Sequence, residues 1–188
     1  MADECRSVRS TARLTVHHLA RLSALAAADR ELFYAAQPYY RDRHVATVLA
    51  QGAGLHFLDG SSGVKDLDVW SFFAIPTRHA RFPADVRQRH VDFGPSDLGR
   101  QLYTPDPAES ESARRRWQRY ANTFSGRRVD LMMRGLRCRV DDDPGDAIRR
   151  WLGLGRRPTD GSPWYLAQKG VVLIDPAERR GEVVWDPR

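Results

Sequence analysis

The chain has 188 residues, of which 41% are hydrophobic, enough to bury one core, and this predicts a single domain. A formal net charge of +6 and a pI near 9.8 indicate either an anionic partner or a solvated arginine surface, and they argue against cationic substrates. No apolar run is long enough for a membrane span, and Cys5 and Cys138 have neither metal-ligand spacing nor a disulfide framework, so we expect a soluble, cytoplasmic protein.

The amino-terminal segment, residues 1–44, is predicted to be helical. Its residues 14–36 carry apolar side chains at helical spacing, and the proline at position 38 ends the element. The apolar stripe consists of Leu19, Leu22, Ala26 and Phe33.

The segment 45–70 holds the most informative pattern of the chain. VATVLAQ predicts a buried strand, Gly52-Ala53-Gly54 predicts a turn that breaks it, and LHFL predicts the start of a helix. DLDVWSFFAI then predicts a second strand, on which Asp66 and Asp68 lie two residues apart and therefore share a face. Two carboxylates on one face are suited to binding Mg²⁺.

A glycine turn followed after about ten residues by Asp-hydrophobic-Asp resembles the nucleotidyltransferase superfamily, especially its minimal, toxin-antitoxin-type members. The resemblance implies a mixed, twisted sheet flanked by helices, with Mg²⁺ or Mn²⁺ on Asp66 and Asp68 and a nucleoside triphosphate as substrate. It implies phosphate binding at Gly52, Ala53 and Gly54. Lys65 joins this nucleotide-binding set, although strand alternation points its side chain away from that of Asp66.

Residues 76–107 are rich in proline and predict a loop-rich insertion with a short strand near residues 89–93, in which Asp92 is a polar residue of interest. Residues 110–124 predict a helix in which arginines lie among Trp117 and Tyr120. Such a helix either binds nucleic acid through phosphate pairing and base stacking, or packs its aromatic residues inward while the arginines stay solvated.

The sequence RVDLMM, residues 128–133, predicts another strand with a single acidic residue, Asp130. Adjacent strands lie about 4.8 Å apart, so this carboxylate can reach ions held by Asp66 and Asp68, and the resemblance implies that it is the third metal ligand. The alternative is that Asp130 pairs with an arginine such as Arg127 or Arg137.

A helix at residues 143–152 and strands at residues 171–174 and 181–185 complete the predicted elements. The likeness to nucleotidyltransferases covers residues 45–175, as the core of one α/β domain over residues 1–188.

The function implied by the resemblance is Mg²⁺-dependent transfer of a nucleoside monophosphate from a triphosphate to an acceptor hydroxyl on RNA or protein. Asp66, Asp68 and Asp130 would be the catalytic residues. The turn lacks the serine or threonine usual in the family, which favours an alternative, a non-catalytic member that binds RNA or a protein partner. A second alternative is a dinucleotide-binding oxidoreductase, because VLAQGAGLHF partly matches that fingerprint, with Phe57 in place of its third glycine.

Overall fold

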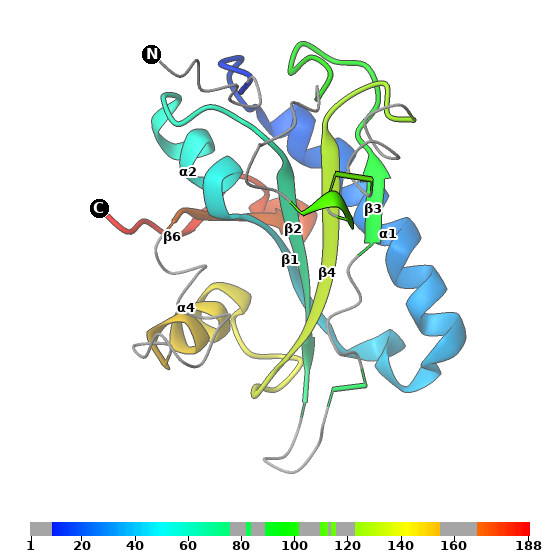
Figure 1. Cartoon of the computed structure of the whole chain (residues 1–188). Helices are drawn as coiled ribbons and strands as arrows, with labels where there is room; N and C mark the ends of the chain where they lie inside the picture. Colours follow the sequence, from blue (N-terminus) through cyan, green and yellow to red (C-terminus); the bar gives the residue numbers. More distant parts are fainter. Residues whose placement is uncertain are drawn as a thin grey trace, which may run out of the picture.

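The computed structural model describes residues 9–75, 82–83, 89–101, 110–112, 114–115, 123–154 and 169–188. These residues form one six-stranded mixed sheet with the strand order β3-β4-β2-β1-β5-β6, flanked by helices (Figure 1). The expected α/β class with a mixed sheet is therefore confirmed. None of the helices in these ranges is long and apolar enough to cross a membrane.

The elements follow the predicted order closely. The helices are α1 (Val16–Ala36), η1 (Pro38–Arg43), α2 (Gln51–Asp59), α4 (Pro144–Leu154) and η3 (Ala177–Arg179). The strands are β1 (His44–Ala50), β2 (Leu67–Ala74), β3 (Arg89–Asp92), β4 (Arg128–Leu136), β5 (Val171–Asp175) and β6 (Val183–Trp185).

At the start of helix α1, the backbone N–H of Thr15 donates to Nδ1 of His18 at 3.1 Å, and the hydroxyl of Thr15 lies 3.1 Å from the same nitrogen. The predicted apolar stripe of this helix is buried against the sheet. After Gln37, Pro38 begins the short helix η1, which leads into β1.

The sheet buries both of its faces, because strand alternation sends successive side chains to opposite sides. One face packs against α1 and α2 through a core that includes Leu49, Val69 and Val129. The other face packs against α4 through a core that includes Phe72 and Ile148. Figure 1 shows α1 and α4 on different sides of the central strands.

The structure around residues 52–54 differs from two expectations. Gly52, Ala53 and Gly54 do not form a separate turn, because they lie in the first turn of α2, and the positive φ of 57° belongs to Gln51. Strands β1 and β2, which flank this helix, are antiparallel. A dinucleotide fingerprint requires two parallel strands around its helix, so the oxidoreductase alternative loses its structural basis.

The predicted insertion, residues 76–107, contributes the edge strand β3, which pairs antiparallel with β4. Of the predicted arginine helix, Glu111, Ser112, Arg114 and Arg115 are helical. Trp117 and Tyr120 lie outside the described residues, so the proposed nucleic-acid-binding surface of this helix stays a prediction.

Candidate active site

Asp68 and Asp130 are brought side by side by the pairing of two strands. Strands β2 and β4 are parallel, and Asp68 is the register partner of Asp130. Asp68 is also the register partner of Ala50 on β1, and Asp130 is the register partner of His90 on β3. Four strands thus contribute one row of residues to the face that packs against α4, at the end of the sheet where β1 leads into α2.

Arg128 links Asp66 to this row. Its Nη2 lies 2.7 Å from Oδ2 of Asp66, and its Nε lies 2.8 Å from Oδ1 of Asp130. Asp66 directly precedes β2, and only 9% of the Arg128 side chain is exposed. We call Asp66, Asp68, Asp130, Arg128 and His90 the carboxylate cluster.

His90 completes the cluster from the edge strand β3. Its Nδ1 lies 2.6 Å from Oδ1 of Asp130, and 14% of its side chain is exposed. Because Arg128 contacts the same oxygen, Asp130 is held from two sides. Such contacts fix the orientation of a carboxylate before a ligand binds.

Asp68 has the most perturbed acid-base equilibrium of the cluster. Burial, followed by the negative charges of Asp66 and Asp130, raises the pKa of its carboxyl group from 3.8 to about 8, although Arg128 and Lys169 oppose the change. Asp68 is therefore largely protonated at neutral pH. A perturbed carboxyl group among other acids is a frequent mark of a functional site.

The predicted nucleotide-binding residues occupy different environments. A Cβ atom added to Gly52 would meet no atom within 4 Å, so this position faces open space at the start of α2. A Cβ added to Gly54 would lie 2.1 Å from the carbonyl oxygen of Gly170, so Gly54 allows α2 to approach the start of β5. Ala53 is buried in the core, and Lys65 is exposed.

Asp92 lies apart from the cluster and has a structural contact set. Its carboxylate accepts hydrogen bonds from the backbone N–H groups of Gly94, Ser125 and Gly126 at 2.8, 2.7 and 2.9 Å. These hydrogen bonds lower the pKa of Asp92 against the opposing effect of burial. Asp92 joins the loop after β3 to the loop before β4.

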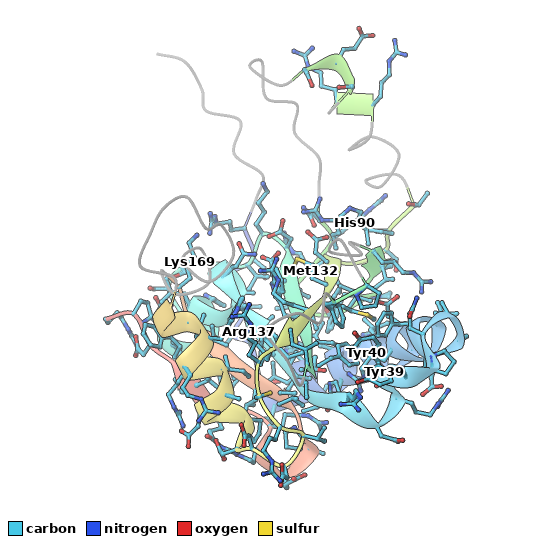
Figure 2. The ribbon with its side chains drawn as sticks, turned by 90° about the horizontal axis from the view of Figure 1, so that it is seen from below. Tyr39, Tyr40, His90, Met132, Arg137 and Lys169 are labelled. Atoms are coloured by element: carbon cyan, nitrogen blue, oxygen red, sulfur yellow. The ribbon has the colours of Figure 1, made fainter. Side chains whose placement is uncertain are left out.

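The sequence interpretation missed Arg128, His90 and Lys169 as members of the site. Strand alternation gave one available signal, because Arg128 and Asp130 lie two residues apart and share a face. His90 could be assigned only after the pairing of β3 with β4 was known. Figure 2 shows His90 and Lys169 on either side of Met132, seen from below.

The donor chemistry of the cluster suits Mg²⁺, which prefers carboxylate oxygens and keeps several waters. Burial is the largest cause of the raised pKa of Asp68, and the negative charges of Asp66 and Asp130 add to it. Asp68 and Asp130 fit as ligands, whereas Asp66 is engaged by Arg128. Within the ranges described, no three His, Cys, Asp or Glu side chains are arranged to hold a metal ion.

Comparisons of the chain with protein-family models, with curated proteins and with solved structures gave no match. The geometry and chemistry of the carboxylate cluster are therefore the basis on which a function is inferred.

Proposed function

We propose that the protein is a Mg²⁺-dependent nucleotidyltransferase, which moves a nucleoside monophosphate from a nucleoside triphosphate to an acceptor hydroxyl on RNA or protein. The observation that carries this proposal is the register pairing of Asp68 with Asp130 on parallel strands, beside the start of α2. Two carboxylates at adjacent positions, with a third one nearby, are the usual means of holding a catalytic divalent ion.

The metal would be held by Asp68 and Asp130, joined by Asp66 if its ion pair with Arg128 opens. When bound, the ion would neutralise charge on the triphosphate and on the leaving pyrophosphate. Binding would require Asp68 to lose its proton, because an ionised carboxylate is the ligand.

The remaining residues would position the substrates and move one proton. Asp130 would accept the proton of the acceptor hydroxyl at a carboxylate oxygen, and the hydroxyl oxygen would then attack the α-phosphorus as pyrophosphate leaves. His90 would keep Asp130 oriented, since its Nδ1 lies 2.6 Å from Oδ1. Lys169 and the backbone N–H groups near Gly52, at the start of α2, would attract the phosphates.

A thermal-shift experiment tests this proposal. We expect nucleoside triphosphates to raise the melting temperature with Mg²⁺ but not with chelator, because a ligand that binds only the folded state stabilises it by mass action. The double variant D66N/D68N should lose this shift. As a matched control, D141N removes one carboxylate from an exposed ion pair with Arg139 and should keep it.

A metal-dependent shift that survives in D66N/D68N, or the absence of a shift with every triphosphate, would contradict the proposal. Where binding is seen, release of pyrophosphate on addition of an acceptor then tests catalysis.

A non-catalytic role in binding RNA or a protein partner is the second candidate, and Arg128 is the observation that favours it. This guanidinium pairs with Asp66 and Asp130 at 2.7 and 2.8 Å and so neutralises part of the cluster without a metal. In that case no triphosphate should bind, and any RNA binding should weaken steeply with salt because counterions are released.

A further inference from the structure

The sheet face that carries the carboxylate cluster continues along β2 and β4 into an aromatic region. After Asp68 on β2 come Trp70 and Phe72, and after Asp130 on β4 come Met132 and Arg134, each pair in register. Trp70 and Met132 are 5% and 7% exposed and form a buried floor. In Figure 2, Met132 lies between His90 and Lys169.

Arg134 lies at the far end of this floor, between two tryptophan rings. Its guanidinium carbon is 5.6 Å from the ring centre of Trp70 and 5.7 Å from that of Trp151, which α4 contributes. Trp151 in turn packs edge-on against Phe72, with ring centres 5.2 Å apart. The aromatic contacts hold the guanidinium in place without using its N–H groups.

The guanidinium of Arg134 lacks an anionic partner in the part of the chain that is described, where it makes no ion pair or hydrogen bond. Burial lowers the pKa of Arg134. The indole N–H of Trp70 is likewise buried without an acceptor among the described residues. The guanidinium of Arg134 is a donor only, so a ligand that pairs with it must present acceptors.

A hollow of about 220 Å³ adjoins Arg134 and is lined by Phe82, Met133, Arg134, Gly135 and Trp151. Pockets that enclose a whole small-molecule ligand usually measure roughly 300–1,000 Å³. The hollow is therefore of a size to take one ring system, with the rest of the ligand outside it.

The spacing along β4 gives the distance between this hollow and the carboxylate cluster. Arg134 follows Asp130 by four residues, which corresponds to about 13 Å along a strand. The ribose and the triphosphate of a nucleotide together span a distance of about this length.

We propose that this hollow binds the base of the nucleoside triphosphate and selects guanine, an inference that rests on the proposed function. Guanine carries two acceptors, O6 and N7, on one edge, and this edge matches the fork of an arginine. Adenine presents an amino group at that edge, so a donor would face a donor. The ring of Trp151 supplies a stacking surface.

Calorimetric titration of the four ribonucleoside triphosphates in Mg²⁺ tests the selection. We expect GTP to bind about tenfold or more tightly than ATP, as a bidentate arginine contact discriminates between bases. R134Q should bring the two affinities close together while Mg²⁺-dependent binding remains. R134K keeps the charge but not the fork and should also lose the preference, whereas R137Q removes an exposed arginine from the same end of β4 and should keep it.

The nucleoside monophosphates GMP and AMP, added without divalent ions, separate failure of this inference from failure of the proposed function. GMP should quench tryptophan fluorescence more than AMP does, and W151F should reduce the difference. Quenching by GMP without binding of any triphosphate would support the guanine pocket and contradict the transferase. Equal Mg²⁺-dependent binding of all four triphosphates would overturn the guanine pocket alone, and no response to GMP or to any triphosphate would overturn both.

Discussion

The two faces of the sheet each carry a group of buried polar side chains, and the two groups differ in how their charges are balanced. On the α1 face, Arg30 donates a hydrogen bond to the hydroxyl of Thr47 at 2.7 Å and pairs with Asp175 at 3.3 Å. The hydroxyl of Thr47 also lies 3.0 Å from Nε2 of His44 and 3.2 Å from Oγ of Ser71. We call this group the helix-anchoring network; its members are Ser23, Arg30, His44, Thr47, Ser71 and Asp175.

The carboxylate cluster on the opposite face has three acids and one arginine. In the helix-anchoring network, burial and then the nearby Arg30 lower the pKa of His44 to about 4, so His44 stays neutral beside the Arg30–Asp175 pair. In the cluster, burial and two neighbouring acids raise the pKa of Asp68 to about 8. A balanced group joins α1 to the sheet, whereas a group with surplus carboxylate can accept a cation.

The largest expected effect comes from removing the arginine of the cluster. R128Q leaves Asp66 and Asp130 without their shared cation and should lower the free energy of unfolding by about 3–5 kcal/mol in chelator. Mg²⁺ should restore part of this loss, because a cation can replace the guanidinium. Denaturant unfolding with and without Mg²⁺ measures both quantities.

The variant R89Q provides the matched control for this prediction. Arg89 also pairs with a buried carboxylate, because its Nη1 lies 3.1 Å from Oδ1 of Asp29, but Asp29 lies on α1, away from the carboxylate cluster. R89Q should be destabilised without recovery in Mg²⁺. If Mg²⁺ restores neither variant, the carboxylate cluster resembles the helix-anchoring network more than a cation site.

The second prediction concerns the helix-anchoring network. R30M keeps much of the side-chain volume but leaves Asp175 with weaker partners, and it should lower the free energy of unfolding by about 3 kcal/mol whether or not Mg²⁺ is present. R139Q, which breaks an exposed ion pair, should leave the unfolding transition unchanged. Recovery of R30M in Mg²⁺ would remove the distinction between the two groups.

The third prediction follows from the raised pKa of Asp68. The folded protein retains this proton up to about pH 8, while the unfolded chain loses it near 3.8, so the stabilising contribution is complete at low pH and is lost as the pH rises through 8. Between pH 6.5 and pH 8 in chelator, the wild type should lose about 2 kcal/mol of stability. D68N should remove this slope. If D68N loses as much stability over this pH range as the wild type, the slope does not come from Asp68.

The smallest expected effect comes from His44, and it has the opposite sign. Its lowered pKa gives a contribution that is complete above 6.5 and is lost as the pH falls through about 4. Between these values, the effects of His44 and Asp68 oppose each other, so wild-type stability should be nearly flat. H44Q should instead gain about 1–2 kcal/mol on acidification from pH 6.5 to pH 5, measured by urea unfolding. A flat profile in H44Q would contradict this assignment.

The local pattern of the sequence predicted most secondary-structure elements, because hydrophobic periodicity and proline act over short distances. It identified α1, β1, β2, β3, β4, α4, β5 and β6 to within a few residues. It predicted a turn at residues 52–54, because glycine has a high backbone conformational freedom that is typical of turns. Tertiary packing instead draws them into a helix, where Gly54 lies against Gly170.

The carboxylate cluster was only partly predictable. Strand alternation predicted that Asp66 and Asp68 share a face. Two possibilities were left open for Asp130: pairing with an arginine, which the structure shows, and a role as metal ligand, which stays a prediction. Asp130 lies beside Asp68, and it pairs with an arginine, Arg128, which was not one of the two considered.

By itself, the sequence determined the α/β class, the order of the elements and the pair of acids, since these follow from short-range periodicity and composition. Only the tertiary structure decided that β2 and β4 run parallel in a register that sets Asp68 beside Asp130, and that His90 arrives from the sheet edge. It also decided that Arg134 meets Trp151 from a helix later in the chain. The physical reason is that strand register and helix packing depend on contacts between residues far apart in the chain, which short-range sequence patterns do not specify.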